Sequence, residues 1–343
     1  MSSKRVLVTG AAGFMGSHLV EALLAKGHTV YGIDDLSGGY LDNVPEECKF
    51  AQLDLREQDA VEQYVQKTKP EIVFHLAADA TEGRSQFTPI QCLQRNLVAY
   101  MYLLTSLIRS GVDKIVLTSS MSVYGSQTPP FHELQDRQPD DIYGICKASM
   151  ERATEVMSEV YGFRYTIVRP HNVYGPKQNM ADPYRNVVAI FINSLLKGKN
   201  FFIYGDGQQQ RAFTYIDDCT PYLLKTGFDR DTDGEIFNIG PDKEYTVNEL
   251  SQVVLGAFGF NGNLPDHLRP KYLPPRPMEV REAFCTCAKA KTMLGFCSSV
   301  TLQEGVARMV EWARRKGPQP QKYLDQLEIV SDSVPETWLR KLI

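Results

Sequence analysis

The first half of the sequence alternates short apolar runs with longer segments of helical periodicity. The runs are rich in β-branched residues and almost continuously apolar, as in strands buried on both faces of a parallel sheet. They occupy residues 5–9, 29–34, 71–77, 114–119 and 164–169. Helical spacing occupies residues 14–27, 59–69, 90–111 and 143–162. This alternation predicts right-handed crossovers and an α/β fold with a doubly wound parallel sheet.

The pattern loosens after about residue 171, where loops rich in Gly, Pro and aromatic residues appear at 171–186 and 271–284. We therefore expect a sheet domain at residues 1–171. Residues 172–343 are expected to form a smaller α/β region that supplies loops over the sheet, with some segments returning to the first domain. The tail, residues 325–343, carries no pattern that we can interpret.

Composition excludes several classes of protein. A net charge of −4 and a pI near 5.9 argue against nucleic acid as the main partner. No apolar run is long enough to span a membrane, and the N-terminus has no signal-peptide pattern. The seven cysteines are scattered, without a CxxC pair or a His cluster. We expect no disulfide framework and no metal site, but reduced thiols in a cytoplasmic protein.

The sequence VTGAAGFMG places Gly10, Gly13 and Gly16 between the first strand and the first helix. Glycines there allow a tight turn and let a pyrophosphate approach the helix N-terminus. A plain strand–helix turn is the alternative, but the second strand ends in Asp34, eighteen residues after Gly16. An acid there accepts hydrogen bonds from a ribose diol and repels a 2′-phosphate, which favours NAD over NADP. We expect the same cofactor to contact Phe14 and Met15 in the loop, and Asp54 and Leu55 further along the chain. For Asp54, a role as an exposed polar residue without a ligand is an equal alternative.

Tyr143 and Lys147 are four residues apart in a helical segment and therefore share one face. An ammonium beside a phenol favours the phenolate, which is a useful general base. With 17 tyrosines, about one such pair is expected by chance. Ser119 and Ser120 strengthen the signal, because they end a strand at the edge where such sheets bind ligands.

Five motifs occur together in one order: VTGAAGFMG, HLAA (75–78), TSSMSVYG (118–125), YGICK (143–147) and RPHNVYGP (169–176). With them, residues 4–300 resemble the extended short-chain dehydrogenase/reductase family, in particular its NAD-dependent nucleotide-sugar epimerases and dehydratases of the UDP-glucose 4-epimerase type. The resemblance implies a Rossmann domain and assigns catalysis to Ser120, Tyr143 and Lys147. It also implies that Lys147 holds the nicotinamide ribose. The resemblance also places His75, Leu76, Ala77 and Ala78 at the cofactor. It assigns Asn96 either to the cofactor site or to a supporting structural role.

The resemblance also implies a nucleotide-diphosphate sugar as the partner. Asn172, Arg211 and Arg276 would contact the diphosphate, since each guanidinium can hold it with two hydrogen bonds. Thr81 and Ser122 would face the sugar. A homodimer through the helices at 91–110 and 142–160 is a further implication of the family.

Met121 and Ser122 bear on the reaction. Members of the family that dehydrate the sugar carry an acidic pair at these positions, decarboxylating members carry Glu at the second, and 3,5-epimerases carry Cys there with a lysine further on. A thioether transfers no proton and a serine is a weak base. Lys177 keeps the 3,5-epimerase alternative open. The sequence therefore favours a 4-epimerase that acts through a transient 4-keto sugar, with a dehydratase, a 4-reductase and an inactive nucleotide-binding protein as alternatives.

Some residues depart from the family pattern. Glu82 and Arg84 follow HLAA. They are expected either to contact a carboxylate or another polar group of the sugar, or to form an ion pair with each other. Tyr100 is expected to pack against the sheet, and Cys146 to be a small helix residue. His171 is expected to be half-buried and hydrogen-bonded, with substrate contact as the alternative.

Overall fold

The computed structural model describes residues 2–260 and 262–343. Its largest element is a parallel sheet of seven strands in the order β3-β2-β1-β4-β5-β6-β11. The strands are β1 (Arg5–Thr9), β2 (Thr29–Asp34), β3 (Lys49–Gln52), β4 (Ile72–His75), β5 (Lys114–Thr118), β6 (Arg164–Pro170) and β11 (Glu235–Ile239). The strand order reverses between β1 and β4, which leaves a crevice at the carboxyl ends of these two strands.

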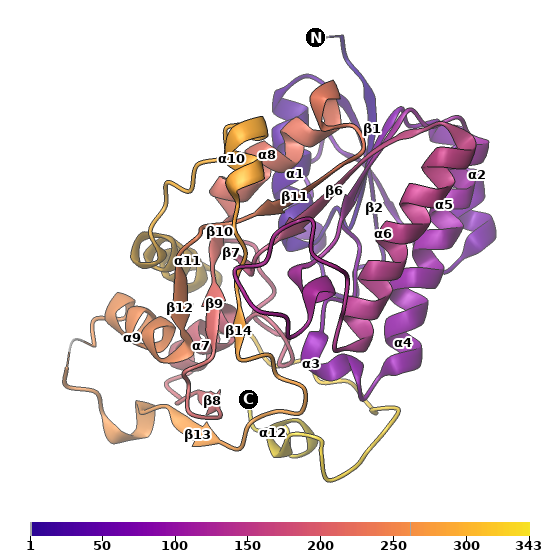
Figure 1. Ribbon diagram of the computed structural model, residues 1–343. Coiled ribbons are helices and arrows are strands. Elements are labelled where there is room, and N and C mark those ends of the chain that lie inside the picture. The colour runs from indigo at the N-terminus through magenta and orange to yellow at the C-terminus, as the bar shows by residue number, and fades with distance from the viewer. Residues whose placement is uncertain (1, 261) are drawn as a thin grey trace.

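Helices cover both faces of this sheet (Figure 1). One face carries α2 (Gln58–Thr68), α5 (Ala99–Arg109) and α6 (Ile142–Tyr161), and the other carries α1 (Phe14–Ala25), α8 (Ile216–Phe228) and α10 (Ala288–Leu294). Alternate side chains of each strand enter opposite layers, so Leu7 packs toward α2 and α5, and Val6 and Val8 pack toward α1. The doubly wound α/β fold expected from the sequence is confirmed.

The structure differs from these expectations in detail. The helix expected at 90–111 is α4 (Pro89–Leu93), a π-helical turn (Gln94–Val98) and then α5. Both edge strands, β3 and β11, lie outside the strand ranges that the sequence predicts. Tyr100 is fully buried against the sheet, as expected, and its hydroxyl is 2.6 Å from Thr154 Oγ1 on α6.

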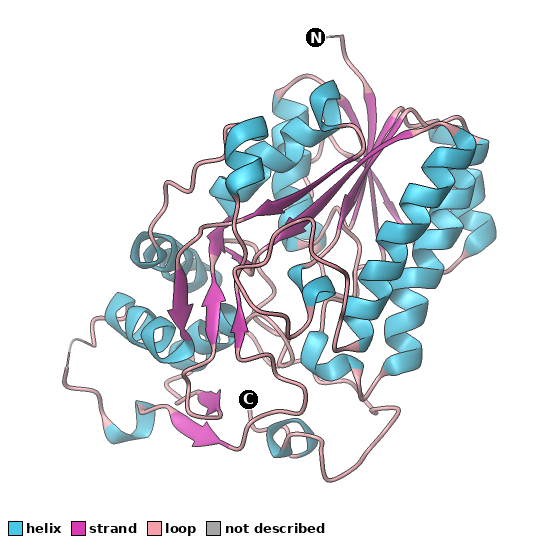
Figure 2. Ribbon diagram, in the orientation of Figure 1, coloured by secondary structure: helices cyan, strands magenta, loops and turns pink. Residues whose placement is uncertain are grey.

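The second half of the chain adds three small sheets. These pair β7 (Val173–Tyr174) with β10 (Thr214–Tyr215), β8 (Phe202–Tyr204) with β13 (Lys271–Leu273), and β9 (Gln210–Ala212) with both β12 (Glu244–Thr246) and β14 (Glu282–Ala283). Three helices pack beside them: α7 (Val187–Leu196), α9 (Val247–Ala257) and α11 (Leu302–Lys316). Long loops lie between these small sheets and the large one (Figure 2).

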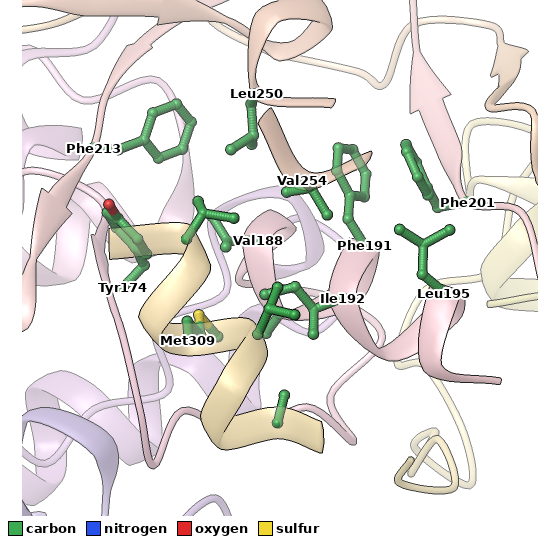
Figure 3. Packing of buried hydrophobic residues seen from close by; sticks show 14 of the residues in the cluster. Tyr174, Val188, Phe191, Ile192, Leu195, Phe201, Phe213, Leu250, Val254 and Met309 are labelled. Carbon is green, nitrogen blue, oxygen red and sulfur yellow. The ribbon is translucent and has the colours of Figure 1, made fainter. Parts of the chain in front are cut away.

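The small sheets and helices share one apolar core (Figure 3). Phe191 of α7 stacks on Phe201 with ring centroids 4.0 Å apart. Leu250 and Val254 of α9 and Met309 of α11 close the core around α7. This packing fixes β9 and the loops next to it, which face the large sheet.

The C-terminal segment, residues 318–343, runs past α3 (Glu82–Ser85) and α4 and ends beyond α12 (Glu336–Leu339) (Figure 1). Trp338 is buried there against Phe87 and Tyr184. The Glu328 carboxylate accepts hydrogen bonds from the first free backbone N–H groups of α4, those of Ile90 and Gln91, at 2.8 and 2.7 Å. A segment without a sequence pattern is therefore held by a few buried side chains, while most of its residues are exposed. Within the described ranges, no helix combines the length and apolarity needed to cross a membrane.

Candidate active site

A cavity of about 680 Å³ lies at the carboxyl ends of the large sheet, where doubly wound folds bind ligands. Its wall comes from the glycine loop after β1, the ends of β2, β4 and β5, and the start of α6. The second half of the chain and the C-terminal segment complete it. Residues from each part of the wall are Gly10, Asp34, Ala77, Ser120, Tyr143, Arg211 and Trp338.

The glycine loop leaves no room for side chains. Gly10 has a φ of +72°, and a Cβ there would lie 2.8 Å from the Ala77 nitrogen. A Cβ on Gly16 would lie 1.9 Å from the Gly10 carbonyl oxygen. The loop thus exposes bare backbone at the N-terminus of α1, which suits the pyrophosphate of a dinucleotide.

Asp34 ends β2 at the rim of this loop. Its carboxylate accepts hydrogen bonds from the Ala12 and Leu36 backbone N–H groups at 3.1 and 2.8 Å. The side chain is buried, and burial raises the pKa of Asp34. A buried carboxylate held at this position suits a ribose diol. The other expected cofactor residues that line the same cavity are Gly13, Phe14, Met15, Asp54, Leu55, Leu76, Ala77 and Ala78. The Asp54 side chain is held by Arg56 at 2.6 Å.

A buried hydroxyl at the end of β5 also fits a polar ligand. Within the described residues, Thr118 Oγ1 is buried without a hydrogen-bond partner, and Thr118 lines the cavity. Such a group costs free energy unless it finds a partner. The glycine loop, Asp34 and this hydroxyl therefore all fit a bound dinucleotide.

Tyr143 and Lys147 lie on one face of α6 at the centre of the wall. Asp141 caps this helix by accepting a hydrogen bond from the Gly144 N–H at 2.7 Å. Lys147 Nζ lies 5.7 Å from the Tyr143 ring centroid and donates to the Thr118 carbonyl oxygen at 2.8 Å. Burial lowers the pKa of Lys147 to about 8.

The Tyr143 phenol is less acidic here than the sequence argument expects. Burial and the Glu82 carboxylate raise its pKa well above the ordinary value, while the Ser120 hydroxyl acts in the opposite direction. Lys147 alone does not offset burial. The phenolate form therefore depends on additional positive charge next to the phenol.

Two serine hydroxyls follow the end of β5. Ser120 Oγ accepts a hydrogen bond from the Ser122 N–H at 3.1 Å, and the two hydroxyl oxygens are 3.0 Å apart. Between them, Met121 is 9% exposed and packs with Val123 and Phe131. Met121 lines the cavity together with the two serines, and its sulfur accepts a hydrogen bond from the Asn172 side-chain amide at 3.8 Å.

Two residues assigned to ligands do not line the cavity. Asn96, expected at the cofactor, is buried in the π-helical turn; its side chain accepts from the Asp79 N–H at 3.0 Å and donates to the Asp79 and Cys92 carbonyl oxygens. Thr81, expected at the sugar, is also buried and donates to the Asp79 carboxylate at 3.0 Å. Both side chains shape the loop that contains Asp79. For Asn96 this agrees with the supporting role that the resemblance left open, and the sugar contact of Thr81 stays a prediction.

Three other candidates lie away from the cavity wall. His75 is buried behind the strand ends and bonds to Thr9 Oγ1 at 2.8 Å, so it does not line the cofactor space. His171 is fully buried, and neither ring nitrogen has a partner among the described residues, so it is neither half-buried nor hydrogen-bonded. Lys177 pairs with Glu21 of α1 at 2.5 Å. Lys177, on which the 3,5-epimerase alternative rested, is thus not among the residues that line the cavity. Cys146 is a buried helix residue beside Cys92, as expected.

The proposed diphosphate contacts line the cavity but already have partners. Arg211 donates to the Gln210 and Val280 carbonyl oxygens at 2.8 and 2.6 Å. The Arg276 guanidinium pairs with Glu279 at 2.7 Å. Asn172 donates to the Ala212 carbonyl oxygen at 2.9 Å, which ties it to β9.

The residues around α3 were the least predictable. Glu82 and Arg84 do not pair with each other: Arg84 is buried and pairs with Asp79 at 2.6 Å. Glu82 faces the cavity and accepts a hydrogen bond from the Ser122 hydroxyl at 3.3 Å. Arg185, which no motif marks, also lines the cavity and pairs with Asp182 at 2.9 Å. Residues of the C-terminal segment that line it are Lys322, Leu324, Trp338 and Ile343.

Comparison with known proteins shows the family of this chain. The model of the NAD dependent epimerase/dehydratase family matches residues 6–240. The chain belongs to this family. The epimerase/dehydratase is 37% identical to a UDP-glucose 4-epimerase of Mycolicibacterium smegmatis, over 91% of this chain and 99% of the relative.

Two solved structures resemble this epimerase/dehydratase closely. The UDP-glucose 4-epimerase of Thermotoga maritima with UDP-glucose is 35% identical, with a TM-score of 0.84 over 91% of this chain and 99% of that one. The UDP-glucose 4-epimerase of Thermus thermophilus in complex with NAD is 32% identical, with a TM-score of 0.83 over 90% and 98% of the two chains. The chain is therefore a member of a family of epimerases and dehydratases that depend on NAD as the cofactor. Among the residues described, no group of His, Cys, Asp or Glu is arranged to hold a metal ion.

Proposed function

We propose that this epimerase/dehydratase is a nucleotide-sugar 4-epimerase. One observation carries the proposal: Tyr143, Ser120 and Lys147 meet at the cavity, and the residues after Ser120 offer no acid. Inversion at carbon 4 needs only a base for the sugar hydroxyl and a retained cofactor. The 37% identity to a UDP-glucose 4-epimerase over 91% of the chain is in agreement with it.

The cofactor would lie along the edge of the large sheet. The bare loop of Gly10, Gly13 and Gly16 would receive its pyrophosphate, and Asp34 its adenine ribose. Lys147, held by the Thr118 carbonyl, would bind the nicotinamide ribose. NAD supplies a positively charged ring that accepts a hydride from the sugar and returns it.

Tyr143 is the proposed base. It takes the proton from the sugar 4-hydroxyl as carbon 4 is oxidised, and returns it when carbon 4 is reduced on its other face. Ser120 holds the same oxygen by a hydrogen bond. Burial makes the phenol a weak acid, so the charge of Lys147 and of the bound cofactor is needed to favour the phenolate. A buried base without cofactor would then be largely protonated.

Ser122 is proposed to hydrogen-bond the sugar, and Asn172, Arg211 and Arg276 to bind its diphosphate. The two guanidiniums line one side of the cavity, and both feel the Glu82 and Glu279 carboxylates. Arg276 pairs with Glu279 in the same loop, and Arg211 donates to the backbone carbonyls of Gln210 and Val280; a diphosphate would replace these partners. Bidentate contacts to phosphate oxygens would favour this exchange.

Proton NMR of the purified protein tests the function directly. UDP-glucose, UDP-N-acetylglucosamine, UDP-glucuronate and GDP-mannose are supplied one at a time, without added cofactor. Conversion of one sugar to its carbon-4 stereoisomer is the expected result. A requirement for external NADH would indicate a 4-reductase, and an unsaturated or 6-deoxy-4-keto product a dehydratase. Bound NAD without conversion of any of these sugars would contradict this choice of substrate class and favour the inactive binding protein.

We further propose that the enzyme is a homodimer through α4 and α6. These neighbouring helices expose apolar side chains on the surface, with exposed fractions of 61% for Ile90, 43% for Leu93, 39% for Val156 and 65% for Val160. Association along these two helices would cover all four side chains. Light scattering should give twice the chain mass, and Val156→Arg should give the single chain mass. A monomeric wild type would contradict the proposal.

A further inference from the structure

Among the described residues, the Glu82 carboxylate has no ion-pair partner, and it lines the cavity. The three arginines around α3 and the cavity wall each have another acidic partner: Arg84 pairs with Asp79, Arg185 with Asp182, and Arg276 with Glu279. Glu82 is accessible to solvent and therefore also to a ligand in the cavity. A carboxylate in such a place is a candidate for a ligand contact or a chemical role.

A chain of hydroxyls joins this carboxylate to the proposed base. Ser122 Oγ donates to Glu82 Oε1 at 3.3 Å and lies 3.0 Å from Ser120 Oγ. Ser120 in turn interacts with the Tyr143 phenol. If Ser122 donates to Glu82, Ser120 can donate to Ser122 and accept from Tyr143, so that all hydrogen bonds run toward the carboxylate.

The carboxylate also borders the space that the sugar must occupy. Its charge acts on Tyr143, and also on Arg211 and Arg276, which are proposed to bind the diphosphate. In a nucleotide sugar, the ring lies between the diphosphate and the reacting carbon 4. Glu82 therefore lies beside the ring, close to the serines that handle the 4-oxygen.

The raised pKa of the Glu82 carboxyl group suits a role in proton transfer. Burial raises the pKa of Glu82, and the hydrogen bond from Ser122 and the charges of Arg185 and Arg276 oppose this rise only in part. A carboxyl group whose pKa is shifted toward neutrality can both accept and donate a proton. The acid that is missing at Ser122 is thus supplied by a different loop.

We propose that Glu82 is a general base toward a ring carbon next to the keto group, which gives the enzyme a second activity, proton exchange at carbon 3 or carbon 5. The inference rests on the proposed function, because oxidation at carbon 4 creates the keto group that acidifies these C–H bonds. Glu82 takes the proton, the C–H electron pair forms an enolate, and the enolate oxygen stays bonded to Ser120 and Tyr143. Return of a proton from Glu82 to the same face of that carbon regenerates the ketone, so that the hydrogen exchanges with solvent while the configuration is retained.

Exchange from deuterated water tests this step separately from hydride transfer. The probe is UDP-4-keto-6-deoxyglucose in D₂O, followed by proton NMR with wild type, Glu82→Gln and Asp140→Asn. Asp140 is the matched control, because it is another carboxylate of the cavity wall but does not belong to the serine chain. Wild type should introduce deuterium at carbon 3 or 5, Glu82→Gln should slow this about 100-fold, and Asp140→Asn should stay within about twofold of wild type.

The outcomes separate the two proposals. No exchange above the rate without enzyme, or equal exchange by wild type and Glu82→Gln, would overturn the role of Glu82. Failure of carbon-4 inversion with the four nucleotide sugars would overturn the 4-epimerase but leave the exchange result standing. Because Glu82→Gln keeps the size of the side chain, the thermal unfolding and the NAD content of the variant should match those of wild type. If deuterium exchange is lost while thermal stability and NAD content are retained, the loss is due to the missing carboxylate.

Discussion

The Arg276 guanidinium lies 2.7 Å from the Glu279 carboxylate, three residues further along the same loop. This pair holds a proposed diphosphate contact in the cavity wall and also masks its charge. A ligand diphosphate and Glu279 therefore compete for one guanidinium.

Glu279→Gln should tighten UDP binding. The change removes a negative charge near both Arg211 and Arg276 and keeps a side chain that can still hydrogen-bond. We expect about a fivefold lower Kd for UDP, equivalent to about 1 kcal/mol, in calorimetric titration. Weaker binding by the variant would mean that Glu279 orients Arg276 for the ligand and does not compete with it.

Gly10→Ala should remove the cofactor. The new Cβ would lie 2.8 Å from the Ala77 nitrogen, and the bare loop would lose its shape. Gly111→Ala is a matched control, since its φ of +76° is similar to the +72° of Gly10 but nothing lies within 4 Å of the added Cβ. NAD released by denaturation should fall at least about tenfold in Gly10→Ala and stay unchanged in Gly111→Ala. Equal losses would show that backbone strain is the cause, and not the close approach.

Asp141→Asn should change how stability depends on pH. Burial, with help from Glu82, raises the pKa of Asp141 to about 7. The folded state therefore holds this proton more tightly than the unfolded state, so Asp141 lowers the free energy of unfolding as pH rises from about 4 to about 7. Asn keeps the helix cap without the charge.

Between about pH 4 and about pH 7, the free energy of unfolding of Asp141→Asn should rise relative to that of wild type, by on the order of 2 kcal/mol at about pH 7. Above about pH 7 this difference should stay constant. Urea unfolding at a series of pH values measures the difference. Parallel curves for the two proteins would contradict the raised pKa of Asp141.

Trp338→Ala should open the cavity from the C-terminal side. Trp338 is 4% exposed and packs on Phe87 and Tyr184, and its loss should cost about 3–5 kcal/mol of local packing. We expect faster hydrogen exchange across residues 318–343 and a raised KM for the nucleotide sugar. Leu342→Ala, in the same segment but 45% exposed, should change neither. An unchanged KM in Trp338→Ala would show that this segment does not confine the substrate.

The sheet and the cofactor loop could be predicted because their signals are local. Strand runs, helical spacing and the glycines near Gly10 lie within short stretches, and the structure keeps them together. Asp34 follows from the same spacing. These elements meet at the sheet edge by topology alone, so they need no side-chain detail.

Other parts of the site depend on contacts between distant residues. Nothing in the tail sequence shows that Trp338 packs on Phe87, and nothing near Arg185 shows that it reaches the cavity. Asn96 and Thr81 illustrate the opposite case: each has a side chain suited to a ligand, but its hydrogen bonds within the Asp79 loop could not be predicted from the sequence. Glu82 combines both problems, because its partner Ser122 lies 40 residues away.

The most direct test of the 4-epimerase follows the hydrogen on carbon 4. The nucleotide sugar that the enzyme converts is prepared with deuterium at carbon 4 and incubated in ordinary water without added cofactor. If hydride leaves and returns on one bound molecule, the inverted product keeps its deuterium at carbon 4. Loss of the label to solvent or to added NAD, or labelled sugar left uninverted while NAD is bound, would contradict the account.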